Sequence, residues 1–255
     1  MVSSMTIGAM AFSIVFSIVL FVGLIVFYKR KVGIYVKPLI IGTIGFLVVT
    51  QVLEKALHFV VFTNFPNFPG HPWLFGLYGG LAAGVFEELG RFVLFTWLLK
   101  KYLDYKGGIS FGIGWGGIEA VALTLMMMVP NLMFAVMINQ GTFESSLGGG
   151  IPGEQLAMIK ETLLNQGSSY YLLASVERFF AAFMQIALSL LVLLGVVRRR
   201  FAYVIYAILI HAVIDYPVAF YQTGHIKSLW IIELYLAVIG LGSMWFIRRM
   251  REVLE

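Results

Sequence analysis

Cysteine is absent from this chain of 255 residues, which excludes disulfides, thiolate nucleophiles and cysteine-ligated metal sites. Charge is also scarce, because charged residues make up 12% of the sequence and hydrophobic residues 60%. In a soluble domain of this length about a quarter of the residues are charged. Since so few polar side chains cannot cover a water-soluble globule, we expect membrane lipids to surround most of the chain.

The start of the sequence lacks the marks of a cleaved signal peptide. No basic residue and no small-residue cleavage site precede Lys29, so we expect the first apolar stretch to remain as a helix. The sequence also lacks an internal repeat, which an inverted-repeat transporter would show. No basic groove with interleaved aromatic residues is present, so nucleic acid is not an expected partner.

Long apolar stretches dominate what is present. Spanning the ~30 Å hydrocarbon core takes roughly 20 apolar residues, and seven stretches have that length. We therefore predict an all-α fold, a polytopic transmembrane helix bundle of about seven helices, in a single domain over residues 1–255. The predicted helices cover about 6–28, 38–62, 73–99, 109–138, 169–197, 201–222 and 229–247.

The basic residues alternate between the two sides of this predicted bundle. Most of the 18 lysines and arginines lie in segments 29–37, 100–108, 198–200 and 248–251, whereas the opposite loops carry only Lys160 and Lys227. Because basic loops stay in the cytoplasm, we predict an N-terminus outside and a C-terminus in the cytoplasm. The long loop at about 139–168 then faces outside. Helical spacing over 154–166 predicts either a surface helix or a lid at a substrate entry.

Seven acidic residues fall inside the predicted spans. A charged side chain at mid-bilayer costs at least ~2.5 kcal/mol on insertion scales. We therefore expect these groups to face the bundle interior and to pair with one another or line a wet cavity. They are Glu54, Glu87, Glu88, Glu119, Glu177, Asp215 and Glu233.

The predicted helix 73–99 carries Glu87, Glu88 and Arg91 within about one turn. At spacings of four and three residues, both carboxylates can reach the guanidinium group. Arg91 can hold one carboxylate ionised while the other exchanges protons near neutral pH, as general acid–base catalysis requires. The structural alternative is an Arg–Glu clamp that only orients helices. A clamp needs one carboxylate, however, and two are present.

The predicted helix 201–222 places His211 and Asp215 four residues apart, on one face. A carboxylate bonded to one imidazole nitrogen fixes the tautomer and leaves the other nitrogen for chemistry. The alternative is a satisfied structural His–Asp pair.

Three further charged groups interrupt the apolar stretches. Glu119 lies at a depth similar to that of Arg91 and can join its cluster, and glycines at 112, 114, 116 and 117 let a neighbouring helix approach there. Glu177 and Arg178 indicate a helix-orienting pair. For Glu54 and His58, near the outer end of the second helix, we expect an interfacial or packing role.

The order of these motifs resembles a known group of intramembrane proteases. The group includes the CAAX-prenyl endopeptidases, the bacteriocin-processing immunity proteins and the PrsW site-1 proteases, and the chain resembles in particular the YhfC family of glutamic-type intramembrane proteases. The similarity covers residues from about 76 to 215 and extends toward both ends. Its motifs are the paired glutamates Glu87 and Glu88 with Arg91, then Trp115 and Glu119, then His211 and Asp215.

The chain departs from the family pattern at one position and keeps a variant at another. Trp115 stands where relatives more often have phenylalanine. Gln185 stands where relatives place a histidine. Glutamine cannot act as a base and is a poor ligand for a transition metal, but it can donate a hydrogen bond to an oxyanion. The chain is therefore either active with Gln185 as a donor or catalytically inactive.

The resemblance implies hydrolysis of peptide bonds in or beside a prokaryotic plasma membrane. Glu87 would activate a water, with Glu88 and Arg91 holding it in place, and His211, oriented by Asp215, would stabilise the oxyanion. Gln185 and Glu119 would support this network. A divalent metal such as zinc is an alternative through His211 and Glu87, but zinc sites usually have more nitrogen or sulfur ligands, so we favour the metal-free version.

The implied substrate is a membrane-tethered peptide or a transmembrane segment. The oligomeric state stays open. Two other functions also stay open: an inactive relative that acts as a membrane scaffold or regulator, for which Gln185 is the best support, and a proton-coupled transporter that uses the buried acids as a relay.

Overall fold

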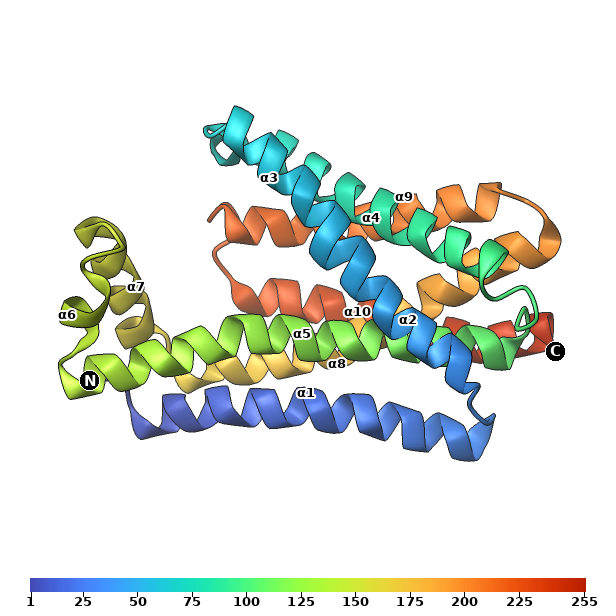
Figure 1. Cartoon of the computed structure of the whole chain (residues 1–255), viewed down its shortest axis with the longest axis horizontal. Coiled ribbons are helices and arrows are strands. Elements are labelled where there is room, and N and C mark those ends of the chain that lie inside the picture. Colours follow the sequence, from blue (N-terminus) through green and yellow to red (C-terminus); the bar gives the residue numbers. More distant parts are fainter. The chain divides into compact units, whose positions relative to one another are not determined.

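The computed structural model describes residues 1–255, without the side chain of Pro69, and every regular element in this described part is a helix (Figure 1). The predicted all-α fold is confirmed. Each predicted span overlaps one long helix, and the second span is a continuous helix made of α2, η1 and α3. The elements are α1 (Ser4–Lys31), α2 (Val36–Val48), η1 (Val49–Glu54), α3 (Lys55–Asn64), η2 (Phe68–Gly70), α4 (Pro72–Trp97), α5 (Tyr105–Gln140), α6 (Phe143–Leu147), α7 (Gly153–Asn165), α8 (Ser168–Arg198), α9 (Ala202–Gln222) and α10 (Leu229–Leu254).

Six helices in the described part of the chain are long and apolar enough to cross a membrane. α4 has the length of a span but is not among them, because Glu87, Glu88 and Arg91 lower its hydropathy. The six are α1, the continuous α2–η1–α3 helix, α5, α8, α9 and α10.

The chain divides into two compact units, and the boundaries between them in the sequence fall within α1, α5 and α8. Unit 1 comprises Met1–Leu20 and Ala120–Phe179, and unit 2 comprises Phe21–Glu119 and Phe180–Glu255. Each unit is described below by itself.

Unit 1 has an apolar core to which the N-terminal end of the chain is bonded. Met10, Met128 and Tyr171 are part of this core, together with Leu163 of α7. The backbone nitrogen of Val2 donates to Asn139 Oδ1 at 2.7 Å. The predicted helix over 154–166 is therefore present as α7, and Leu163 packs it into unit 1.

An exposed ion pair joins α6 and α7 in the same unit. Lys160 Nζ lies 2.5 Å from Glu144 Oε1. The bond that this ammonium group donates lowers the pKa of the Glu144 carboxyl group.

Unit 2 gathers the basic loops at one end. Figure 1 shows the loops that follow α1, α4 and α8, and the C-terminal end of α10, at this end (right in the view). The hydroxyl of Tyr35 donates to Asp104 Oδ2 at 3.2 Å, and Lys106 Nζ lies 4.2 Å from the centroid of the Tyr35 ring. The Asp104 carboxylate also raises the pKa of the Tyr35 hydroxyl. The grouping agrees with the predicted positive side, while the orientation itself stays a prediction.

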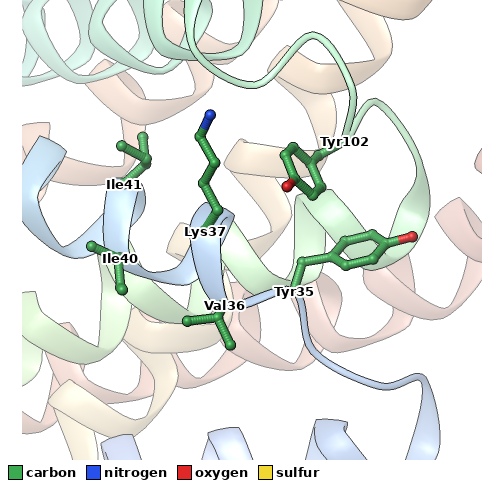
Figure 2. A pocket seen from close by; sticks show the side chains of 6 residues that line it. All are labelled: Tyr35, Val36, Lys37, Ile40, Ile41 and Tyr102. Atoms are coloured by element: carbon green, nitrogen blue, oxygen red, sulfur yellow. The ribbon is translucent and has the colours of Figure 1, made fainter.

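A pocket of about 460 Å³ opens at this end of unit 2 (Figure 2). Its lining combines the amine of Lys37 with aliphatic and phenol side chains, and it contains none of the predicted catalytic residues. The lining residues are Tyr35, Val36, Lys37, Ile40, Ile41 and Tyr102.

Candidate active site

Glycines on α4 bring α9 into close contact with it. A Cβ atom on Gly80 would lie 2.5 Å from the backbone oxygen of Ala212, and one on Gly84 would lie 2.7 Å from that of Ile208. Only a residue without a side chain fits at either position. Glu88 follows Gly84 by four residues and so shares its helix face. The spacing of Gly80, Gly84 and Glu88 therefore directs the Glu88 carboxylate at α9.

A second pair of glycines brings α8 against α5. A Cβ atom on Gly112 would lie 2.8 Å from Ile186 Cα, and one on Gly116 would lie 2.8 Å from Gln185 Cβ. The expectation that these glycines admit a neighbouring helix is confirmed. The close approach places Gln185 within reach of Glu119, which lies one turn beyond Gly116 on α5.

Arg91 is the centre of the cluster that results. Its side chain is fully buried, and its Nη2 donates to Glu87 Oε2 at 2.8 Å. Its Nη1 donates to Glu88 Oε1. The guanidinium group also stacks over the Trp115 ring, 4.6 Å from the centroid. A buried cation held by two carboxylates and an aromatic face has little freedom to move, so Arg91 fixes both glutamates.

Glu87 has one occupied oxygen and one available oxygen. Its Oε2 accepts from Arg91 and, at 2.9 Å, from Trp115 Nε1. No hydrogen bond reaches its Oε1 from the described side chains. That oxygen is also not among the described atoms that are fully buried without a hydrogen-bond partner. Glu87 is thus held at one oxygen and can accept a proton at the other.

Glu88 and His211 connect α4 to α9. His211 Nδ1 lies 2.7 Å from Glu88 Oε1, and both side chains are almost completely buried. His211 Nε2 lies 3.5 Å from Asp215 Oδ2, at the outer limit of a hydrogen bond. The closer partner of His211 is therefore Glu88 on another helix, whereas the sequence had predicted Asp215. The side chain of Asp215 is 35% exposed, so the Nε2 edge of the ring faces the more open side.

Gln185 bridges two charged groups inside the cluster. Its Oε1 accepts from Arg91 Nη2, and its Nε2 donates to Glu119 Oε2. One amide thus pairs with a buried guanidinium and a buried carboxylate at once, while Arg91 Nε has no hydrogen-bond partner among the described residues.

The structure brings together every residue that the sequence proposed for the site. All of them lie in unit 2, and the contacts above join them. Glu177 lies outside the group, in unit 1, and forms an ion pair with Arg178. The sequence reasoning missed Gly80 and Gly84. Their four-residue spacing ahead of Glu88 was a signal that could have found them. The proposed residues are Glu87, Glu88, Arg91, Glu119, Gln185, His211 and Asp215.

The fold and this cluster define a multi-pass integral membrane protein with a carboxylate, arginine and histidine site among its helices. A family model described as YhfC intramembrane metalloprotease matches residues 16–236. The chain is also 36% identical to the uncharacterized membrane protein YhfC of Bacillus subtilis (strain 168), over 258 residues that cover 100% of each chain. No solved structure matches it. The chain belongs to the YhfC family, as its motifs predicted. The bacterial relative agrees with the predicted plasma membrane of a prokaryote.

The family description implies a metal ion, and the donor atoms of this cluster do not fit one. In the part of the chain that the structure describes, no group of three or more His, Cys, Asp and Glu side chains is arranged to hold a metal. His211 and Glu87, the pair that the sequence left open for a metal, are bonded to Glu88 and Arg91. The guanidinium group of Arg91 already places a positive charge against both glutamates.

Proposed function

We propose that this protein is an intramembrane endopeptidase that hydrolyses peptide bonds with a water activated by Glu87. The observation that carries the proposal is the contact between helices that binds His211 to Glu88, beside the Arg91-held carboxylate of Glu87. This contact assembles a base and a hydrogen-bond donor within one buried group. A clamp that only orients helices needs neither the second glutamate nor the imidazole.

The hydrolytic step begins at the available oxygen of Glu87. Glu87 Oε1 takes a proton from water while the water oxygen forms a bond to the carbonyl carbon of the substrate, and the carbonyl electron pair moves to its oxygen. The carbon–nitrogen bond then breaks, and Glu87 returns the proton to the leaving nitrogen. Arg91 and Trp115 donate to the other oxygen of Glu87, and these two bonds fix the orientation of its carboxylate.

His211 supplies the donor for the oxyanion in this proposal. Glu88 accepts from Nδ1 at 2.7 Å and so positions the ring, while the longer contact from Nε2 to Asp215 leaves that edge available. Removing a donor of this kind typically lowers the rate by a factor of ~10²–10³. Gln185 supports the network by accepting from Arg91 Nη2 and donating to Glu119 Oε2.

The substrate class follows from where the site lies. Because the cluster is buried among helices of which α5, α8 and α9 are long and apolar enough to span lipid, a soluble peptide has no direct approach to it. A membrane-embedded segment or a membrane-tethered peptide can enter between helices. Membrane lipids and this substrate are the partners that we propose.

Cleavage of a reporter transmembrane peptide in proteoliposomes tests the proposal. The native chain should cleave the peptide, and Glu87→Gln should abolish cleavage because an amide cannot accept the proton. Glu177→Gln is the matched control, since it makes the same change at a glutamate outside the cluster. Equal activity in Glu87→Gln and in the native chain would rule out the mechanism.

Gln185 supports the second candidate, a catalytically inactive scaffold or regulator. If the native chain does not cleave the reporter and Gln185→His does, the inactive reading holds. If Gln185→His gains nothing over an active native chain, the bridge between Arg91 and Glu119 is sufficient as it stands.

A further inference from the structure

A second group of polar side chains lies beside the cluster, on η1, α3 and α4. Glu54 ends the π-helix η1 and is one of its two buried residues, with Thr50. His58 follows one turn later in α3, and Tyr78 faces it from α4. A π turn holds an extra residue and redirects the side chains near it, and such turns are frequent at functional sites. Glu54, placed by the sequence near a helix end, is buried within this turn.

These three side chains form a continuous hydrogen-bonded line. His58 Nε2 lies 3.3 Å from Glu54 Oε1, and His58 Nδ1 lies 2.7 Å from the hydroxyl of Tyr78. Exposure rises along the line, from 11% for the side chain of Glu54 to 28% for that of His58.

The buried end of the line lies on η1, which packs against α4, the helix that carries Glu87. Gly90 of α4 lies one turn beyond Glu87. The helices also touch there, because a Cβ atom on Gly90 would lie 2.9 Å from Val49 Cγ2 at the start of η1. The line therefore runs from the partly exposed surface of α3 to η1, which touches α4 one turn from Glu87.

Hydrolysis inside a membrane needs such a line. Each peptide bond cleaved consumes one water, and hydrocarbon supplies none. A water that crosses a dry interior needs two to four polar partners. Ionisable side chains within spans line wet cavities or pathways for this reason.

We propose that Glu54, His58 and Tyr78 line the path by which water reaches Glu87 from the surface of unit 2 at α3. This inference rests on the proposed function, which makes water a substrate. In it, Glu54 and His58 act by offering hydrogen bonds to passing water. They are not bases of the reaction.

The structural alternative is a latch, by which we mean a contact that only holds α3 against α4. Aromatic contacts already fasten them, since the ring of Phe62 lies 6.1 Å from that of Phe75 and 6.0 Å from that of Tyr78. A latch and a path differ in what they change: loss of a latch loosens α3, whereas loss of a path slows the arrival of water at Glu87.

The indole N–H of Trp115 reports that arrival directly. It is buried and bonded to Glu87, and the chain has only five tryptophans to resolve. We would label the tryptophans of the full chain with ¹⁵N, transfer the protein to D₂O in detergent, and follow each indole signal by NMR. Trp115→Phe assigns the signal, and the exposed indoles of Trp73 and Trp230 serve as internal references.

Glu54→Leu should slow exchange at Trp115 by about tenfold, because water on the path loses a polar partner. His58→Leu should do the same and covers the case in which Glu54→Leu does not fold. Glu54→Gln keeps hydrogen-bonding groups and should exchange at the native rate. Phe75→Leu weakens the aromatic packing of α3 against α4 at a ring outside the described aromatic contacts of His58, and it should also leave the rate unchanged.

Each other outcome overturns the proposal. An unchanged rate in both leucine variants means that water arrives elsewhere. Equal slowing in Phe75→Leu indicates a latch, and equal slowing in Glu54→Gln indicates a proton relay. None of these exchange measurements depends on peptide cleavage. Absence of cleavage in the native chain would defeat the proposed function, whereas the exchange rates alone decide whether Glu54 and His58 line a water path.

Discussion

Replacing Gly80 by alanine should separate α4 from α9. The added Cβ atom would lie 2.5 Å from the backbone oxygen of Ala212, where an ordinary contact begins at 3.4 Å. A backbone oxygen cannot turn away as a flexible side chain can. The helices must therefore part by about 0.9 Å at this contact, because repulsion rises steeply below the van der Waals distance.

That displacement is large for the bond on which the site depends. Glu88 lies two turns beyond Gly80 on the same face, and its distance of 2.7 Å to His211 Nδ1 would grow to about 3.6 Å, which is no longer a hydrogen bond. A misplacement of about 1 Å can lower a rate by about 10²-fold. We expect a loss of that size in kcat for the reporter peptide.

The assay pairs this variant with Gly79→Ala. A Cβ atom on Gly79 meets nothing within 4 Å, so the control gains the same methyl group on the same helix without a clash. Gly79→Ala should cleave at the native rate and melt at or above the native temperature in detergent, whereas Gly80→Ala should lose rate and melt lower. Native cleavage by Gly80→Ala would refute the argument that close helix contact assembles the site.

Three further outcomes follow from the contacts. Trp115→Phe should lower kcat by about tenfold and leave KM unchanged, because it removes a donor to Glu87 but keeps an aromatic ring; a changed KM alone would contradict this. A metal chelator should leave the cleavage rate unchanged, and a loss that zinc restores would contradict the metal-free mechanism. Since Lys160 lowers the pKa of Glu144, their contact stabilises the α6–α7 segment above the ordinary carboxyl pKa and is lost as pH falls through the lowered value. Lys160→Gln should move the ¹³C carboxyl titration of Glu144 upward in pH, and an unmoved titration would show that the ion pair has no effect.

The spans and the presence of α7 could be predicted from the sequence because both depend on local properties. Length and hydropathy decide whether a segment can cross lipid, and helical spacing of apolar residues decides whether a loop contains an amphipathic helix. The contacts of Glu87 and Glu88 with Arg91 were predictable for the same reason, since residues three and four apart on a helix are neighbours.

The partner of His211 was not predictable in this way. Spacing within α9 favoured Asp215, which lies 3.5 Å from the His211 ring. Glu88 on α4 is closer, at 2.7 Å. Which helix lies against α9 depends on where backbones can approach, and Gly80 and Gly84 decide that only once both helices are in place. Gln185 shows the same limit, because its two bonds join helices α4, α8 and α5.

The sequence by itself determined that the chain enters the membrane as helices and that these helices carry acidic residues spaced to meet arginines and histidines, since hydropathy and spacing depend on the order of residues along the chain. Only the tertiary structure decided which of these groups meet, and it showed that Glu54 is buried within a π turn. The reason is physical: contacts within a helix depend on neighbours a few residues away, whereas contacts between helices depend on the fit of two whole surfaces.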